Sequence, residues 1–565
     1  MPDTNQPKLR DKSMNGADLI LQILKREGVE ILPAFPHSDL IEAAAKIGVR
    51  PIIVRQERQA IHIADGYLRT TGGLKPCATA VQYGPGSENS MGAVAQCFAD
   101  NVPILHLPGG YDRDNQGISP NFSAVRNMQH INKWCELVNR ADRIPQMMQN
   151  AFAIVRNGRP GPVTLEVPHD IFTEEVDPTL AEQYKLQRRS TPSADLGDIH
   201  ELVDIVLGAS TPVIVAGQGV LYAGATDQLV EFVELTQIPV MSTLNGKGCF
   251  PENHPLSLGC AALSRPDSVV HFLNKADLIV GIGTSFTRSE YITPFPTKGR
   301  TYVQLTNWEG DIAKDYPIDF SIIGDAKPTL ESMNLDVIRH HGKGGRQKNL
   351  ANQEEIAAVK KTFLQKWRPL LESDESPINP YRVVWDLMRS VDRTKTIVTH
   401  DAGSPRDQTT PFYETIIPHG YLGWGKTTQL GTGLGLIQGA KLARPNWNCI
   451  NIMGEAAFGM VGMDFETAVR NRIGTTTIVM KNSVMGGYAD NHPVAAQQYG
   501  IHELGGDYAD VAKALGGYGE RITKPEQIMA ALQRALETNN NGTPAVIEII
   551  TSEETRKATT LPNDI

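Results

Sequence analysis

Short apolar runs alternate with amphipathic stretches along the first third of the chain. Residues 16–29 place apolar side chains three and four positions apart, and this spacing predicts a helix that begins at Gly16 and ends around Gly28. Strands and helices that alternate in this way are typical of a parallel sheet covered by helices. The apolar runs of strand length lie at residues 51–55, 77–82, 102–110 and 162–168.

The same alternation occurs twice more. Polar segments at residues 177–195 and 338–355 have the composition of linkers between the three series. The pattern predicts an α/β fold with three doubly wound parallel-sheet domains, which we place at residues 14–180, 196–335 and 376–555. The second series of runs lies at residues 211–217, 238–243, 276–283 and 301–306, and the third at residues 394–403, 450–454, 475–481 and 543–551.

Composition and charge narrow the classes of function. The 565 residues are 41% hydrophobic and 21% charged, which is ordinary for globular domains. A formal net charge of -9 gives no electrostatic reason to expect binding to nucleic acid or to an anionic membrane. No apolar run approaches the roughly 18 residues of a membrane span, residues 1–13 carry no signal-peptide core, and the six cysteines form no C-x-x-C pair. We therefore expect a cytoplasmic protein without a disulfide framework or zinc site.

One stretch of the third series carries an acid and an amide at two successive strand ends. Glu455 follows the run at residues 450–454, within GEAAFG, and Asn482 follows the next run. An open parallel sheet forms its ligand crevice at such ends. Backbone amides at the start of a helix favour a phosphate group, and the Mg²⁺ that accompanies a diphosphate takes oxygen ligands. The stretch indicates a diphosphate and metal site; the alternative is that Glu455 caps a helix and Asn482 begins a turn.

Two features of the first series are weak evidence for a ligand site when each is considered alone. Glu57 follows an apolar strand and begins a predicted helix, where a glutamate is usually a terminal residue favoured by the helix dipole. Gly84, Pro85 and Gly86 form a predicted tight turn between strand and helix, with Asn89 in the first turn of that helix. Cap and turn chemistry alone would explain either feature.

Together and in this order, the motifs resemble those of the thiamin diphosphate enzymes of the acetolactate synthase, benzoylformate decarboxylase and pyruvate decarboxylase superfamily. VRQERQAIHIADGYLRTTG resembles the family's glutamate helix, and GPGSEN followed by ADNVPILHLPG resembles its Gly-Pro-Gly turn and next strand. NGRPGPVTLEVPHDI resembles the end of the first domain in synthase-like members, and QLGTGLGLIQGAKLA the segment beneath the cofactor. GEAAFG with the later Asn482 resembles the metal and diphosphate motif. The likeness covers nearly the whole chain.

The resemblance implies a role for each of these positions. Glu57 would hydrogen-bond the aminopyrimidine ring of thiamin diphosphate and activate this carbanion-stabilising cofactor, and Leu430 would support its bent shape. Mg²⁺ would be bound by Glu455, Asn482 and the carbonyl of Val484. The remaining cofactor-binding positions that the resemblance implies are Gly84, Asn89, Gly403, Ser404, Thr428, Gly454, Ala456, Ala457 and, through its side chain, Asn482.

The resemblance also implies an assembly. In this family the first domain binds the pyrimidine ring, the third binds the diphosphate, and the site lies between the first domain of one subunit and the third of another. We therefore expect a homodimer or homotetramer, with Glu57 and Glu455 of one chain serving different sites.

The chain departs from the family pattern at the metal motif and after it. Glu455 stands where the family has Asp, which keeps the charge but adds a methylene to its reach, and Lys481 replaces the first residue of an Asn-Asn pair. The segment after Asn482 lacks the tryptophan of biosynthetic acetolactate synthases, which leaves FAD binding open. A non-catalytic relative with a drifted metal motif is an alternative, against which the retained Glu57 and Gly-Pro-Gly turn argue.

Side chains near the expected reactive centre should determine which substrate the site accepts. The resemblance places His37 and Ser38, in AFPHSDL, over the reactive ring, and Gln82 where benzoylformate decarboxylase has a histidine. His37 could move protons near neutral pH or simply be a hydrogen-bonded loop residue, whereas Gln82 can only hold an oxygen. Tyr488 is expected to face the pocket. Lys133 resembles a lysine of the synthase-like branch, or is a solvated lysine at a strand start.

The sequence thus predicts a thiamin diphosphate- and Mg²⁺-dependent carbon–carbon lyase or ligase that acts on a small 2-oxo acid or 2-hydroxy ketone. Its catalytic residues would be Glu57, His37, Gln82 and Tyr488. The motif AAFGMVGMD resembles that of 2-hydroxyacyl-CoA lyases and oxalyl-CoA decarboxylases, so an enzyme of that kind is an alternative.

Overall fold

The computed structural model describes residues 14–292, 294–347 and 349–558. Two compact units make up this part of the chain. The first unit contains residues 14–61, Lys75–Phe98 and Pro103–Arg189, and the second contains His62–Leu74, Ala99–Val102 and residues 190–558. Helix α3 (Glu57–Thr70) begins in the first unit and ends in the second.

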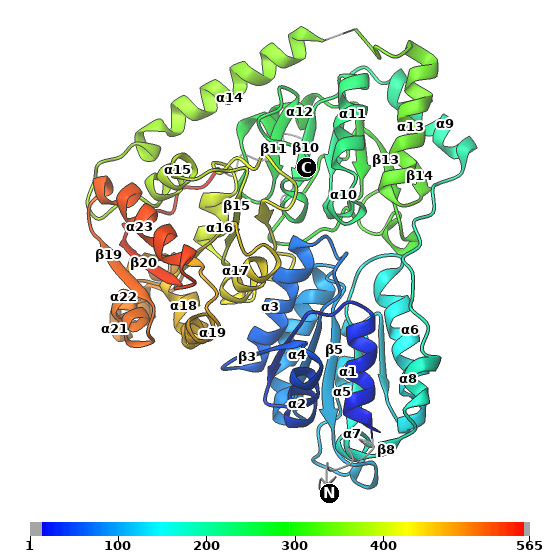
Figure 1. Ribbon diagram of the computed structural model, residues 1–565. Coiled ribbons are helices and arrows are strands. Elements are labelled where there is room, and N and C mark those ends of the chain that lie inside the picture. Colours follow the sequence, from blue (N-terminus) through cyan, green and yellow to red (C-terminus); the bar gives the residue numbers. More distant parts are fainter. Residues whose placement is uncertain (1–13, 293, 348, 559–565) are drawn as a thin grey trace, which may run out of the picture. The chain divides into compact units, whose positions relative to one another are not determined.

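A six-stranded, wholly parallel sheet forms the centre of the first unit, with strand order β3-β2-β4-β5-β7-β6. Helices α1 and α6 pack against each other and enclose a core with the sheet (Figure 1). The strands are β2 (Ile31–Phe35), β3 (Arg50–Ile53), β4 (Ala78–Val81), β5 (Leu105–Gly110), β6 (Trp134–Leu137) and β7 (Val163–Pro168), with a small antiparallel pair of β1 (Met14–Asn15) and β8 (Glu175–Val176). The helices are α1 (Gly16–Arg26), α2 (Ser38–Ile47), α4 (Pro85–Ala99), α5 (Ala124–Met128), α6 (Ile144–Arg156), α7 (His169–Thr173) and α8 (Thr179–Gln183).

The second unit contains two further parallel sheets of six strands each. The first has the strand order β11-β10-β9-β12-β13-β14. Its strands are β9 (Pro212–Ala216), β10 (Val240–Thr243), β11 (Ser257–Ala261), β12 (Leu278–Ile282), β13 (Thr301–Thr306) and β14 (Phe320–Ile323). The accompanying helices are α9 (Leu196–Gly208), α10 (Gln218–Ala223), α11 (Thr226–Thr236), α12 (Asp267–Lys275) and α13 (Ala326–His341), followed by the long α14 (Leu350–Leu371).

The last sheet has the strand order β16-β15-β17-β18-β20-β19. Its strands are β15 (Thr396–His400), β16 (Tyr421–Leu422), β17 (Asn448–Gly454), β18 (Thr476–Lys481), β19 (Tyr518–Ile522) and β20 (Ala545–Ile550). The helices are α15 (Pro380–Ser390), α16 (Ser404–Thr409), α17 (Thr432–Ala443), α18 (Glu455–Val461), α19 (Phe465–Asn471), α20 (Tyr488–Asn491), α21 (Pro493–Tyr499), α22 (Tyr508–Ala514) and α23 (Ile528–Asn540).

The three sheets confirm the predicted α/β class and explain its sequence pattern. Strands such as β4 and β9 are buried along their whole length because helices cover both faces, so they read as unbroken apolar runs. Among the strands of the three sheets, the apolar pattern did not mark β2, β6, β11, β14, β16 and β19, which are short or contain proline, glycine or polar residues. Within the described ranges, no helix has the length and apolar character needed to cross a membrane.

Helices α3 and α17 approach each other closely at two glycines, which have no side chain to keep the backbones apart. A Cβ on Gly66 of α3 would lie 1.9 Å from the carbonyl oxygen of Leu436 in α17, and a Cβ on Gly439 of α17 would lie 1.9 Å from that of Ile63 in α3. Each glycine therefore admits the backbone of the other helix.

The order of strands reverses in each of the three sheets, beside β2, β9 and β15, and each reversal places a crevice there. In the first unit the chain passes from β2 to β3 on one side and then returns to β4 on the other side of β2. In the last sheet β15 likewise lies between β16 and β17. Loops after such neighbouring strands diverge, and ligands of open α/β sheets bind at these points.

Candidate functional site

In the first unit, Glu57 lies at the first residue of α3 and is 4% exposed. Its Oε2 accepts a hydrogen bond from Nδ2 of Asn89, on α4, at 3.1 Å. Gly84 precedes α4 with a φ of +60°, and a Cβ there would lie 2.8 Å from the hydroxyl of Tyr111. The tight turn therefore requires glycine, and it leads the chain into the helix that carries Asn89.

A pocket of about 200 Å³ opens at the crevice between β2 and β4. His37, Ser38 and Gln82, which the sequence predicts near the reactive centre, all line it. Glu57 is not among the lining residues. His169 and Asp39 also line the pocket, with Nδ1 and Oδ2 3.4 Å apart; sequence reasoning did not single out this pair.

His37 is buried, with its ring edge-on to Phe172 at a centroid distance of 4.6 Å. Its Nε2 has no hydrogen-bond partner among the residues that the structure describes. Burial lowers the pKa of His37 from its ordinary value to about 4, an effect that the charge of Asp39 only partly offsets. His37 is therefore neutral at neutral pH, and its ring can exchange hydrogen bonds with a ligand but cannot act as a resident cation.

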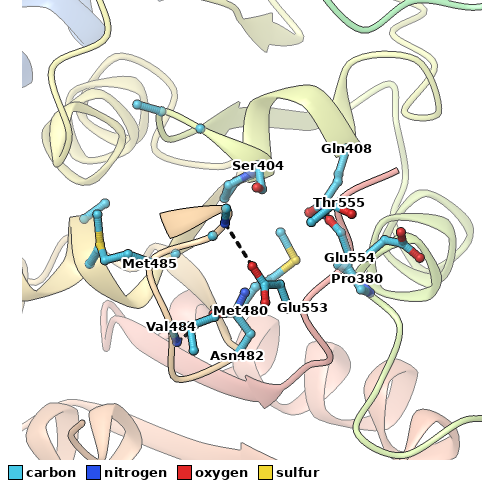
Figure 2. A pocket seen from close by; sticks show the side chains of 18 of the residues that line it. Pro380, Ser404, Gln408, Met480, Asn482, Val484, Met485, Glu553, Glu554 and Thr555 are labelled. Atoms are coloured by element: carbon cyan, nitrogen blue, oxygen red, sulfur yellow. Dashed lines mark hydrogen bonds between the residues drawn. The ribbon is translucent and has the colours of Figure 1, made fainter. Parts of the chain in front are cut away.

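In the second unit, a pocket of about 600 Å³ lies at the carboxyl ends of β15, β17, β18 and β20. Figure 2 shows Ser404, Asn482 and Glu553 around this hollow. A Cβ on Gly403 or Gly454 would meet no atom within 4 Å, so both backbones face open space. The sequence-predicted residues that line the pocket are Gly403, Ser404, Thr428, Leu430, Gly454, Glu455, Ala456, Ala457, Asn482, Val484 and Tyr488.

Glu455, the first residue of α18, is 3% exposed and reaches the loop after β18. Its Oε1 accepts a hydrogen bond from the Ser483 amide at 2.6 Å, and the Asn482 Oδ1 accepts one from the Val484 amide at 3.1 Å. Burial raises the pKa of the Glu455 carboxyl, against the effect of the backbone amides of residues 455, 482 and 483 and of the charge of Lys481. The longer acid is therefore accommodated by direct contact with the loop that contains the other two predicted metal ligands.

Lys481 does not line this pocket. Its ammonium donates to the Gly506 carbonyl and lies 3.3 Å from the Glu548 carboxylate, which is fully buried on β20. The lysine that replaces the family's first asparagine thus neutralises a buried acid and leaves the pocket to Asn482. Among the described residues, no cluster of three or more His, Cys, Asp or Glu could hold a metal, and the predicted ligand set contains only one carboxylate.

Asp401 fixes the segment that follows Leu430. This fully buried carboxylate accepts hydrogen bonds from the amides of Gly431 and Gly433, both at 2.9 Å, and from Ala402 at 2.8 Å. Gly431 has a φ of +90°. Asp401 was missed in the sequence, although its place at a strand end before a glycine-rich segment was a usable signal.

Lys133 is not the solvated lysine at a strand start that was one of its two interpretations from sequence. It is half-buried, and its ammonium donates to the carbonyls of Ile154 and Asn157 at 2.5 and 2.6 Å. These carbonyls lie at the C-terminal end of α6, so Lys133 caps that helix instead of projecting into solvent.

Three domain models of one family match the chain: the N-terminal TPP binding domain of thiamine pyrophosphate enzymes at residues 14–134, the central domain at 199–333 and the C-terminal TPP binding domain at 401–549. The chain belongs to the thiamine pyrophosphate enzymes. Both pockets lie at the strand ends of the sheets whose domain models are named for TPP binding.

Within that family the chain is similar to acetolactate synthase large subunits. It is 29% identical to the "Probable acetolactate synthase large subunit" of Methanococcus aeolicus, over 93% of this chain and 90% of the relative. It is 27% identical to the glyoxylate carboligase of Escherichia coli O157:H7, over 95% and 93%. It is 25% identical to the acetolactate synthase isozyme 3 large subunit of Escherichia coli K12, over 95% and 94%.

Proposed function

We propose that this protein is a thiamin diphosphate- and Mg²⁺-dependent carbon–carbon ligase or lyase that acts on a 2-oxo acid or a 2-hydroxy ketone, as an acetolactate synthase-like enzyme. One observation carries the proposal: the second-unit pocket joins open glycine backbones at Gly403 and Gly454 to the carboxylate of Glu455 and the amide of Asn482. Backbone amides at strand ends suit a diphosphate, and oxygen donors suit Mg²⁺. The donor set therefore fits the cofactor and its metal.

The chain's own residues divide the remaining tasks. Thiamin diphosphate, when bound, supplies a stabilised carbanion. Glu57 would hold the aminopyrimidine ring, with its carboxylate oriented by Asn89. Leu430, packed against two apolar clusters, would support the cofactor, and Asp401 fixes the backbone beside it. His37, as a neutral ring, and Gln82 would hydrogen-bond substrate oxygens in the first-unit pocket.

The assembly and domain division form part of the same proposal. We propose domains at residues 14–180, 196–335 and 376–555, and a homodimer or homotetramer in which Glu57 and Glu455 of one chain serve different sites. The support is the separation of the predicted residues into two pockets that belong to different domain models.

Calorimetric titration of thiamin diphosphate into metal-stripped protein, with and without Mg²⁺, tests the proposal. Tight binding that requires Mg²⁺ is expected, followed by turnover in a screen of small 2-oxo acids. Absence of binding in the natural protein, with recovery only in Glu455→Asp, would identify a lost metal site and a non-catalytic relative.

A further inference from the structure

The pocket of the first unit is lined by two histidines in contrasting surroundings. His37 is 7% exposed, and its Nε2 has no hydrogen-bond partner among the described residues. A Cβ on Gly109, which also lines the pocket, would lie 3.5 Å from this nitrogen, so the glycine leaves it room for a ligand. The side chain of His169, the first residue of α7, is instead 51% exposed. His169 is therefore in contact with solvent as well as with the pocket.

Asp39, on α2, orients the ring of His169. Its Oδ2 lies 3.4 Å from Nδ1 of His169, and its side chain is 27% exposed. A carboxylate beside one ring nitrogen leaves the other, here Nε2, for a ligand. The next acid along the chain, Asp170, is engaged elsewhere, because it accepts hydrogen bonds from Nε of Arg113 at 2.5 Å and from the Arg113 amide at 3.1 Å. A histidine oriented by an acid is a common arrangement for proton transfer in enzymes.

The two histidines and Asp39 form one electrostatic cluster. Burial is the main cause of the low pKa of His37; the charge of Asp39 opposes it, and the charge of His169 adds to it. His37 thus stays neutral and offers the ligand a hydrogen bond. Histidine is the side-chain type that exchanges protons near neutral pH, and His169 is the one that is not buried.

We propose that His169, oriented by Asp39, is the acid–base residue that exchanges a proton with the substrate oxygen bound at Nε2 of His37. The inference rests on the proposed function and adds a catalytic residue to it. When a carbon–carbon bond forms at a substrate carbonyl, the π electrons of C=O move to the oxygen, and Nε2 of protonated His169 gives this oxygen its proton. In cleavage, Nε2 takes the hydroxyl proton, C=O forms again, and the electron pair of the broken bond leaves with the other carbon.

Modification of histidines by diethyl pyrocarbonate, mapped by mass spectrometry of peptides, tests the pocket in protein without thiamin diphosphate. Hydroxyacetone, a small 2-hydroxy ketone, is the probe. At about ten times its Kd it should slow the modification of His169 about 10-fold, because only the empty pocket reacts. Gly109→Ala places a methyl group against His37 and should weaken this protection. His271, 42% exposed and paired with Glu355, is the matched control and should react at the same rate with and without the probe.

Steady-state kinetics of the holoenzyme separate the two histidines. His169→Gln should lower kcat by about 10²- to 10⁴-fold with little change in KM, because it removes the proton but not the binding contact. His37→Gln should mainly raise KM. Asp39→Asn should lower kcat by roughly 10- to 100-fold, and Asp39→Glu, which keeps the carboxylate, should recover part of the loss. His271→Gln should change neither constant.

The outcomes separate the inference from the proposed function. Full kcat in His169→Gln would overturn the inference and leave the proposed function standing, whereas failure of thiamin diphosphate to bind, seen by calorimetry alone, would refute both. Modification of His169 at the same rate with and without hydroxyacetone would also overturn the inference, whether or not the cofactor binds. Should His169→Gln fail to fold, the comparison of Asp39→Asn with Asp39→Glu gives the kinetic readout.

Discussion

The side-chain amide of Asn89 donates a hydrogen bond to the buried carboxylate of Glu57, Nδ2 to Oε2, at 3.1 Å. The bond joins the first residue of α3 to the helix that follows the Gly84 turn. Two sequence features that are each explained by cap and turn chemistry when read alone are thus connected in space. The contact orients the carboxylate of Glu57, as the proposed role at the cofactor requires.

Glu57→Gln should abolish activity while leaving the fold and the cofactor affinity nearly intact. The amide keeps the shape and can still contact Asn89, but it cannot exchange a proton with the cofactor. Loss of general acid–base catalysis predicts a fall in kcat of about 10²- to 10⁴-fold. Steady-state kinetics beside calorimetry of thiamin diphosphate will measure both quantities. Full activity in this variant would show that Glu57 has only a structural role.

Asn89→Ala should lower kcat less, by roughly 10- to 100-fold, because it misplaces the carboxylate without removing it. Asn127→Ala is a suitable control, since Asn127 is exposed and its side-chain amide donates to the nearby Ser123 carbonyl. An unchanged kcat in Asn89→Ala would show that the 3.1 Å bond does not orient Glu57.

Glu455→Gln should weaken Mg²⁺-dependent binding of thiamin diphosphate. The substitution removes the only carboxylate of the predicted ligand set while keeping an oxygen that can accept from the Ser483 amide. By comparison with changes around other metal sites, about 10- to 100-fold is expected. Titrations at several Mg²⁺ concentrations will measure it. If the variant retains the natural Mg²⁺ dependence, Glu455 is a helix cap only.

Asp401→Asn should both destabilise the protein and weaken cofactor binding. An amide in place of the carboxylate sets its NH₂ group against one of the backbone amides that Asp401 now accepts from, which costs about 1–3 kcal/mol of unfolding free energy. The backbone beside Leu430 then loses its anchor, so the affinity for thiamin diphosphate should fall. Asp392→Asn, at an exposed turn, is the control for denaturant unfolding and calorimetry. If the affinity for thiamin diphosphate is unchanged, Asp401 stabilises the fold but does not contribute to the cofactor site.

The stability of the protein should depend on His37 between about pH 6.5 and pH 4. Burial lowers the pKa of His37 to about 4 in the folded state, whereas an unfolded histidine titrates near 6.5. As the pH falls through this window the unfolded chain binds a proton that the folded chain does not, so the free energy of unfolding falls, by up to about 3 kcal/mol. Denaturant unfolding of the natural protein and of His37→Gln at pH 7, 5.5 and 4.5 will isolate this contribution. If the free energy of unfolding falls by the same amount with pH in both proteins, this contribution of His37 is contradicted.

The fold and part of the site could be predicted because both depend on local patterns. Gly403, Glu455 and Asn482 follow apolar strands, and parallel strands bring their carboxyl ends to one edge. His169 and Asp39 could not be predicted as a pair, since 130 positions separate them and only the fold brings their side chains together. The burial that lowers the pKa of His37 likewise comes from distant residues such as Phe172.

The contact between α3 and α17 has a genetic consequence. Gly66 and Gly439 each admit the other helix's backbone, so a side chain at either position separates the same two helices. The second substitution would then act on a contact that is already open, and the two effects on stability should be far from additive. Although 373 positions apart in the sequence, the two glycines would therefore behave under mutation as a single locus.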